Sequence, residues 1–375
     1  MKFLHTADWQ LGMKATDVGG VGARLREERL LAARRVVETA QTHSAQFILV
    51  AGDTFEDNGV DRILVQKAAD VLAASNIPVF IIPGNHDPFT PGSVWEHPAW
   101  KSAENVQVLY EKQPVEIPGG LLYPCPIWEK HSGKDPTAWI HAAEATGIKL
   151  GMAHGTVEGV QQEEPDYPIP RNAALRSGLD YLALGHWHST AIYSGGDDVA
   201  RMAYSGTHET TKFGERDSGN ILIVDIPSAG AAPVITTVHT GGLTWRALEA
   251  DIRDRGDLLR LREEIEDIEN PSSVLIELCI RGLLSAEDRG EMVHIGEILS
   301  SRFLYSHVDD LHLHPSPEDE SWVASLPPGV IREAGARLRE LANPGFSGGR
   351  PDGASEEVAS RALMELYALV RKVSP

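Results

Sequence analysis

The chain has 375 residues, of which 42% are hydrophobic and 23% are charged, and its formal net charge is −20 at pH 7. This length exceeds what one hydrophobic core usually holds, so we expect about two or three domains. No apolar run approaches the roughly 20 residues that a membrane-spanning helix needs, and the first residues lack the basic and apolar regions of a secretory signal. The two cysteines, Cys125 and Cys279, lie far apart and form no metal-binding motif, which favours a reduced, cytoplasmic protein.

The acidic charge bears on what the chain can bind alone. Proteins that hold DNA by themselves usually carry a basic face, whereas here acidic residues outnumber basic ones both before and after residue 240. If the substrate is a polyanion such as DNA, we expect a partner protein to supply much of the positive surface.

The first part of the chain alternates strands with helices. Short apolar runs predict strands at residues 2–4, 47–50 and 78–82. Apolar residues at helical spacing predict helices over residues 24–43 and 61–75. This β-α-β-α-β order favours a parallel sheet with right-handed crossovers.

From about residue 106 the pattern changes to short strands and turns, which predicts a second sheet. Asp135-Pro136 suits a helix start, so we expect a helix from Asp135 to Thr146. Strands separated by Gly, Ser and Asp follow His188, and we expect them to pair in antiparallel fashion. Residues 1–240 are therefore predicted to form an α/β domain of two sheets with helices outside, an α-β-β-α sandwich.

Gly241-Gly242 marks a predicted domain boundary. Residues 241–315 show the strand and helix patterns of a small α+β domain. A segment rich in Pro, Ser and acidic residues follows, and residues 329–375 are predicted to form a C-terminal helical segment. The sequence leaves open whether these last helices pack on the protein itself or bind a partner.

Five predicted strands end in polar residues of the types that bind metal ions. In α/β folds, ligands bind outside the carboxyl ends of strands, and one layout repeated in five segments favours a shared site. In chain order these candidate metal ligands are Asp8 and Gln10, Asp53, Asn85, His154, and His186 with His188.

This ligand set points to a pair of metal ions. Carboxylate, amide and imidazole ligands together suit Mn²⁺, Fe²⁺ or Zn²⁺ better than Ca²⁺. The ligands are too many for one ion that keeps open positions, so we expect two divalent ions that share one carboxylate. Such a pair stabilises the attacking and leaving oxygens of phosphoryl transfer and activates a bound water. His86 is then placed to protonate the departing oxygen, and we expect Asp87 to orient its ring.

The candidate ligands resemble the five motifs of the calcineurin-like metallophosphoesterase superfamily, namely Asp8-x-Gln10, Gly52-Asp53, Gly84-Asn85-His86-Asp87, His154 and Gly185-His186-x-His188. Further stretches resemble the SbcD-type DNA repair exonuclease family, namely His5-Thr6-Ala7-Asp8-Trp9 with Leu11-Gly12, and Tyr204-Ser205-Gly206 with Lys212-Phe213-Gly214-Glu215. The first motif of the superfamily ordinarily reads Asp-x-His. Gln10 departs from it, which predicts a weaker or more selective first metal site, and the sequence leaves open whether Gln10 is a ligand or a bystander.

The resemblance implies a Mn²⁺-dependent DNA exonuclease, often with endonuclease activity, that works in DNA repair with an SMC-like ATPase of the SbcC type. It implies that His86 is the catalytic histidine, that the small second domain is a DNA-recognising cap, and that the last helices bind the coiled coil of the ATPase. By the same resemblance, one ion is held by Asp8, position 10, Asp53 and His188, and the other by Asp53, Asn85, His154 and His186.

Two other functions remain open. The acidic charge fits a phosphoesterase that acts on small phosphodiesters or phosphoproteins, because an acidic enzyme alone repels DNA. Gln10 fits a structural subunit with a weakened metal site. The sequence also leaves open whether the chain forms a homodimer, and we expect no membrane partner.

Overall fold

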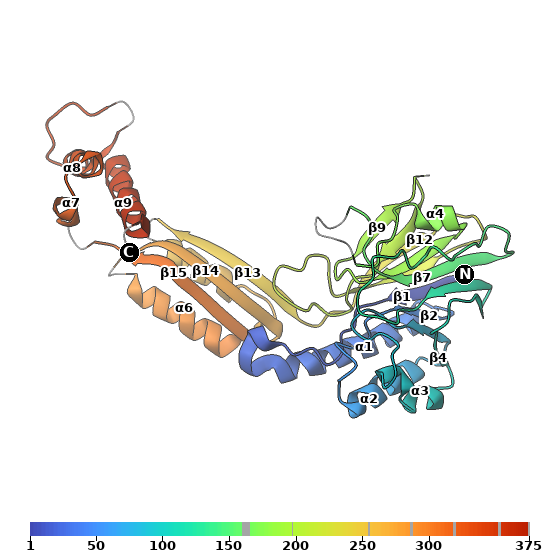
Figure 1. The fold of residues 1–375 in the computed structure, drawn as a ribbon. Helices are drawn as coiled ribbons and strands as arrows, with labels where there is room; N and C mark the ends of the chain where they lie inside the picture. The colour runs from blue at the N-terminus through green and yellow to red at the C-terminus, as the bar shows by residue number, and fades with distance from the viewer. Residues whose placement is uncertain are drawn as a thin grey trace. The chain divides into compact units, whose positions relative to one another are not determined.

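The protein is described by a computed structural model over residues 1–159, 166–196, 198–253, 256–285, 288–317, 320–351 and 354–373. The chain divides into two compact units, Met1–Thr244 and Trp245–Pro375 (Figure 1). Within the described ranges, no helix has both the length and the apolar character that crossing a membrane requires. The finer division of residues 241–375 into a small domain and a helical segment stays a prediction.

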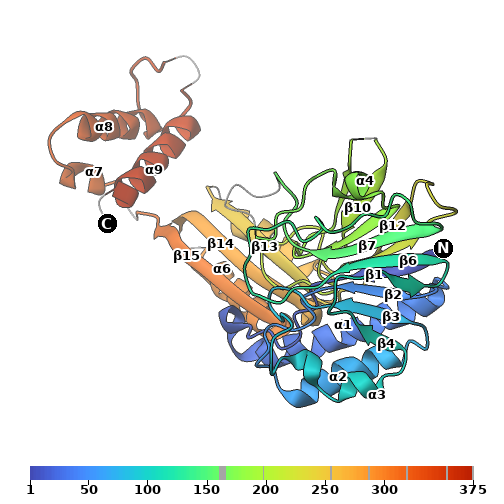
Figure 2. The same cartoon turned by 45° about the vertical axis from the view of Figure 1, so that its right-hand side comes forward.

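Two six-stranded sheets form the centre of the first unit (Figure 2). In spatial order, the first sheet contains β12 (Val234–His239), β11 (Asn220–Asp225), β1 (Lys2–Thr6), β2 (Ile48–Ala51), β3 (Val79–Ile82) and β4 (Val106–Val108). The second contains β5 (Val115–Ile117), β6 (Gly120–Cys125), β7 (Ile148–His154), β8 (Tyr181–Gly185), β10 (Ala200–Tyr204) and β9 (Ala191–Ser194). The predicted α/β fold with two sheets is confirmed.

Most of the central strands run parallel. β1, β2, β3 and β4 are parallel neighbours, and so are β6, β7, β8 and β10. β11 pairs antiparallel with β1, and β9 pairs antiparallel with β10. The parallel pairing of β10 with β8 corrects the expectation that the strands after His188 are all antiparallel.

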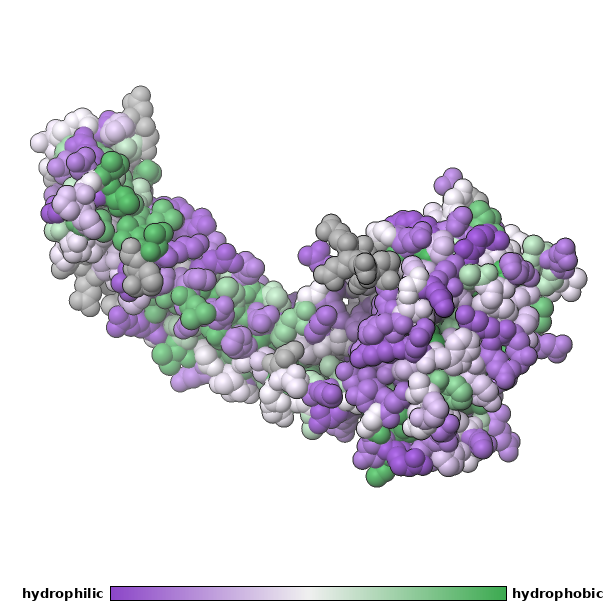
Figure 3. All heavy atoms as spheres, in the orientation of Figure 1, coloured by the Kyte–Doolittle hydropathy of each residue, from purple (hydrophilic) through white to green (hydrophobic). Residues whose placement is uncertain are grey.

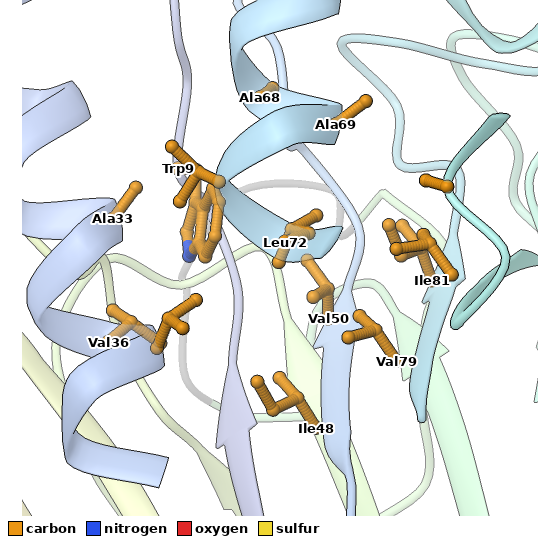
Figure 4. Close-up of a cluster of buried hydrophobic side chains, with 14 of the residues drawn as sticks. Trp9, Ala33, Val36, Ile48, Val50, Ala68, Ala69, Leu72, Val79 and Ile81 are labelled. Atoms are coloured by element: carbon orange, nitrogen blue, oxygen red, sulfur yellow. The ribbon is translucent and has the colours of Figure 1, made fainter. Parts of the chain in front are cut away.

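Strand β2 shows how the layers are held together. Successive side chains of a strand point to opposite faces, so Ile48 and Val50 contact the outer helices while Leu49 and Ala51 lie between the sheets. The outer layer consists of α1 (Gly22–Thr42), α2 (Arg62–Ala73) and the short α3 (Ala99–Ser102). Figure 4 shows this outer cluster, in which Trp9 lies between α1 and α2, and α2 covers side chains of β2 and β3.

Residues 135–146 form turns, so the predicted helix there is wrong. The Asp135 carboxylate accepts hydrogen bonds from the backbone N–H and the hydroxyl of Thr137 at 2.8 and 2.6 Å. The N–H of Ala142 donates to the Ser177 carbonyl at 2.9 Å, next to α4 (Ala173–Ser177). Local side-chain bonds of this kind compete with helix formation, and burial of Ile140 and Ala142 against the second sheet keeps the segment irregular.

The second unit contains a three-stranded sheet and two groups of helices. The sheet has the order β13 (Thr244–Ile252), β14 (Val274–Leu284) and β15 (Tyr305–Pro315), and α5 (Asp257–Glu266) and α6 (Arg289–Arg302) share a buried core with it. The remaining helices are α7 (Trp322–Ser325), α8 (Val330–Ala342) and α9 (Glu356–Val373). Hydrophobic side chains gather on the surface of these last helices, whereas the visible face of the first unit is mostly hydrophilic (Figure 3).

Candidate metal centre

The polar residues that follow five parallel strands converge at one edge of the sandwich. β1, β2 and β3 of the first sheet carry Asp8 with Gln10, Asp53 and Asn85 just past their ends. In the second sheet, His154 is the last residue of β7, and His186 with His188 follows β8. Because the hydrogen bonds below join residues from the two sheets, the carboxyl ends of both sheets face the same site.

Asn85 connects the two sheets at the centre of this site. Its Oδ1 accepts from His154 Nε2 at 2.8 Å and from His186 Nδ1 at 3.1 Å. His154 Nε2 also lies 3.3 Å from Asp53 Oδ2. Ligand atoms of Asp8, Asp53 and His154 all lie within 4.8 Å of one another, and all three side chains are buried. Such a cluster of convergent oxygens and imidazole nitrogens fits divalent transition ions.

Gln10 reaches the same site. Its Nε2 lies 3.0 Å from His188 Nε2, and the electrostatic interaction of His188 with Asp8 joins this pair to the rest of the cluster. A half-turn of the Gln10 side-chain amide exchanges the positions of its nitrogen and oxygen. After that half-turn, the Gln10 side-chain oxygen, which can coordinate a cation, would lie beside His188 Nε2.

The motif glycines allow the strands to bring these residues so close. A side chain at Gly84 would place its Cβ 2.1 Å from Asp53 Oδ1, and one at Gly185 would place it 2.0 Å from the Ala51 carbonyl. Real Cβ atoms do not approach other atoms so closely. The glycine before Asn85 and the glycine before His186 are therefore required by space.

Four candidate ligands have backbones that bulky residues rarely adopt. φ is 53° at Asp8, 40° at Gln10, 50° at Asp53 and 108° at His186. Positive φ costs free energy for residues other than glycine, and such strain persists where the surrounding contacts enforce it. Here the N–H of Asp8 donates to Gly52 and the N–H of Gln10 donates to Asp53. These bonds hold Asp8 and Gln10 in their strained conformations beside the loop of Asp53.

Electrostatics in the cluster favour binding of positive charge. Burial raises the pKa of Asp8 to about 6, although His154 and His188 act against this. For Asp53, burial also opposes ionisation, but the neighbouring His154 outweighs it and holds the pKa below its usual range. Burial lowers the pKa of His154, yet the attraction of Asp53 and Asp8 prevails and raises it to about 9. His154 Nδ1–H donates to the Ala51 carbonyl at 2.9 Å, so a cation would replace the proton on Nε2.

Glu215 is a candidate functional residue whose role was not predicted, although it ends one of the stretches that resemble the SbcD family. Its Oε1 accepts from His188 Nδ1 at 2.7 Å, and its other oxygen accepts from the Thr211 N–H at 2.8 Å. Burial alone would raise the pKa of Glu215, but the bond to His188 prevails and lowers it to about 2. A carboxylate on the far nitrogen of a metal-binding histidine fixes the tautomer and leaves Nε2 free for the ion.

Arg29 of α1 is a second residue that sequence reasoning missed. Its buried guanidinium donates to the carbonyls of Trp9 at 2.9 Å, Asp8 at 3.3 Å and Glu209 at 2.7 Å. It thus ties the loop that carries Asp8 to the segment after β10. An arginine within a helix carries no sequence signal for this role, because its partners are backbone carbonyls.

The structure corrects the expected role of Asp87. Its two oxygens accept from the N–H groups of Phe55 and Gly84, at 2.9 and 2.7 Å, and burial raises its pKa to about 7. His86 Nδ1 instead donates to the Glu56 carbonyl at 3.0 Å. Asp87 therefore shapes the loops around His86, whereas a backbone carbonyl orients the ring.

We expect Glu215→Gln to weaken binding of Mn²⁺ by about 10- to 100-fold, because loss of an outer-shell carboxylate has effects of that size. The glutamine amide can still accept a hydrogen bond from His188 Nδ1, but it is uncharged and stabilises the Nδ1–H tautomer less than the carboxylate does. Isothermal titration with Mn²⁺ measures the change. An unchanged affinity in the folded variant would show that His188 is not a ligand held by Glu215.

Gln10→His should strengthen binding of Mn²⁺ at the site that contains His188, because imidazole is a better ligand for this ion than an amide oxygen. Metal titration of hydrolysis should then reach saturation at a lower Mn²⁺ concentration. Gln10→Ala provides the comparison. If all three proteins titrate alike, position 10 is a bystander.

Comparisons with known proteins agree with this geometry. Residues 1–190 match the family described as calcineurin-like phosphoesterase. The chain is 23% identical over 301 residues to the uncharacterized metallophosphoesterase YhaO of Bacillus subtilis (strain 168). The matched region covers 75% of this chain and 72% of YhaO.

Two solved structures are also similar in part. The crystal structure of TT1561 of Thermus thermophilus shares 11% identity, with 64% of this chain and 98% of that chain covered and a TM-score of 0.42. That of Pseudomonas putida nuclease MPE shares 14% identity, with 61% and 85% covered and a TM-score of 0.26. At these TM-scores neither structure adds to the assignment.

Proposed function

The chain belongs to the calcineurin-like phosphoesterase family, and from this membership we propose that it is a two-metal DNA exonuclease and endonuclease of the SbcD type. It is a metal-dependent hydrolase of phosphate esters. The observation that carries the proposal is the convergence of seven ligand-type side chains from five strand ends, with His86 in the loop that carries Asn85.

These ligand side chains fit two divalent ions, and we propose that both ions are Mn²⁺. Asp8, Gln10, Asp53 and His188 would hold one, and Asp53, Asn85, His154 and His186 the other. Bound ions of this kind polarise the phosphate and lower the pKa of bound water. The Ala51 carbonyl and Glu215 orient the imidazoles of His154 and His188 through Nδ1, and the Glu56 carbonyl holds the His86 ring by Nδ1. His86 Nε2 is then free to give a proton to the departing oxygen.

The stretches that resemble the SbcD family support the finer assignment because they act at this site. Glu215 bonds His188. The Tyr204 hydroxyl donates to the Gly155 carbonyl at 2.6 Å and accepts from the Val157 N–H at 2.8 Å, which fixes the chain just after His154. Glu215 thus holds the ring of one candidate ligand, and Tyr204 holds the backbone next to another, which supports a role for these motif residues at the metal centre.

We also propose that α8 and α9 bind an SMC-like ATPase. Large apolar side chains are exposed on these helices, including Val330, Ile331 and Leu369, which are 80%, 56% and 58% exposed. Exposed apolar clusters on helices are typical of protein interfaces. The Leu369→Asp variant should associate more weakly with a purified SbcC-type ATPase, as measured by co-elution in size-exclusion chromatography. If the native chain and the variant co-elute with the ATPase equally, α8 and α9 do not form this partner surface.

The function is tested by assaying purified protein with linear DNA, circular DNA, a chromogenic phosphodiester and a phosphoprotein across a Mn²⁺ titration. We expect Mn²⁺-dependent degradation of linear DNA, with and without the ATPase. The net charge of −20 favours a second candidate, a phosphoesterase for small phosphodiesters or phosphoproteins. Rapid cleavage of the chromogenic ester or phosphoprotein while DNA stays intact would select that candidate.

A further inference from the structure

Two loops flank the candidate metal centre and carry exposed aromatic side chains. β4 is the parallel neighbour of β3, and Tyr110 lies just beyond its end. β6 is the parallel neighbour of β7, and Trp128 lies just beyond its end. Since β3 and β7 lead into Asn85 and His154, both aromatic residues lie at the edge of the sandwich that holds the metal centre.

Hydrogen bonds join these loops to the loop of His86. The N–H of Phe89, three residues after His86, donates to the Ile127 carbonyl at 2.9 Å. The indole N–H of Trp128 donates to the Tyr110 carbonyl at 3.1 Å. The aromatic residues are thereby fixed to the backbone that carries the catalytic candidate.

Two of these aromatic rings stack on each other, and Tyr110 and Trp128 are each partly exposed. Phe89 and Tyr110 stack with their centroids 4.8 Å apart and their planes 11° from parallel. Tyr110 is 47% exposed and Trp128 is 43% exposed, and a hollow of about 230 Å³ lies beside Tyr110. Lys112 covers one ring face of Trp128, with its Nζ 5.3 Å from the centroid. Glu111 also lines the hollow, but it accepts a hydrogen bond from Gln113.

We propose that Phe89, Tyr110 and Trp128, here called the aromatic platform, stack an unpaired base at the end of the DNA strand whose phosphodiester enters the metal centre. The inference rests on the proposed nuclease function and deepens it, because it names single-stranded or frayed ends as the substrate. Open aromatic faces bind bases of any sequence, and Lys112 adds a positive charge near the phosphates.

The test uses a DNA oligonucleotide that ends in 2-aminopurine, a fluorescent base whose emission falls when it stacks. The His86→Ala protein is titrated with this oligonucleotide, so that binding is measured without cleavage. We expect quenching in that protein and its loss in His86→Ala combined with Tyr110→Leu or with Trp128→Leu. Loss of a stacked base should weaken affinity by about 5- to 150-fold. Tyr110→Phe is the matched control, because it keeps the ring and should keep the quenching.

A second readout separates this inference from the function on which it rests. The protein with native His86 should cleave an end that bears a base faster than one that ends in an abasic site, and Tyr110→Leu should remove that preference. Hydrolysis of DNA with equal rates on both ends, and no quenching, would overturn the aromatic platform alone. If neither DNA nor a simple methyl 4-nitrophenyl phosphate is hydrolysed with Mn²⁺, the proposed nuclease function fails. The quenching titration would still decide whether the platform binds a base.

Discussion

Replacing His86 with alanine should lower phosphodiester hydrolysis by about 10²- to 10⁴-fold, the usual contribution of a positioned general acid. The ring is held by Nδ1 at the Glu56 carbonyl and is only half-buried, so its second nitrogen is accessible to a departing oxygen. No predicted metal ligand is lost, so the variant should still bind two ions. Single-turnover rates with Mn²⁺, together with a metal count of the same sample, measure both quantities.

His141→Ala is the control for this substitution, because His141 is an exposed histidine of the same unit. It should hydrolyse the substrate at the native rate. Equal rates for His86→Ala and His141→Ala would show that proton transfer at His86 is not part of the reaction.

Asp53→Asn should weaken binding of both ions by more than about a hundredfold, beyond the range for outer-shell residues, because one carboxylate is proposed to bridge them. The rate of hydrolysis should fall as the bound metal is lost. The asparagine keeps an oxygen that can accept from the His86 N–H, which donates to Asp53 Oδ1 at 2.9 Å in the native protein. The loop can therefore keep its form, and circular dichroism checks the fold before the metal is counted.

The matched control is Asp57→Asn in the same loop. The Asp57 side chain is 46% exposed, its Oδ2 lies 3.9 Å from Lys14 Nζ, and its Oδ1 accepts from the Gly59 N–H, a bond that asparagine can keep. This control should bind metal like the native protein. If Asp53→Asn retained one ion at native affinity, Asp53 would belong to a single metal site and the bridging role would be wrong.

The central sheet and the grouping of the candidate ligands could be predicted because both depend on short-range patterns. Buried parallel strands appear as apolar runs, and their carboxyl ends meet at one edge. The glycines at positions 84 and 185 belong to the same patterns, since only glycine fits where the backbone approaches Asp53 and Ala51. The resemblance to a family then implied roles for residues that the strand pattern had already placed at one edge of the sheet.

Other features could not be predicted because they depend on contacts between segments far apart in the chain. The helix predicted from Asp135 fails because Ala142 bonds Ser177 and buries against the second sheet. Asp87 follows His86 in sequence, yet the fold gives its carboxylate to the backbone of Phe55 and Gly84. Glu215 lies 27 residues from the histidine that it orients. Strand β13 had no predicted counterpart, because its apolar residues form neither a continuous run nor a strict alternation.

The most direct measurement is an anomalous difference map from a crystal of the native protein grown with Mn²⁺. We expect two peaks about 3.5–4 Å apart, with Asp53 between them, His188 bound to one ion and His154 with His186 bound to the other. A single peak, or two peaks without Asp53 as a common ligand, would contradict this expectation.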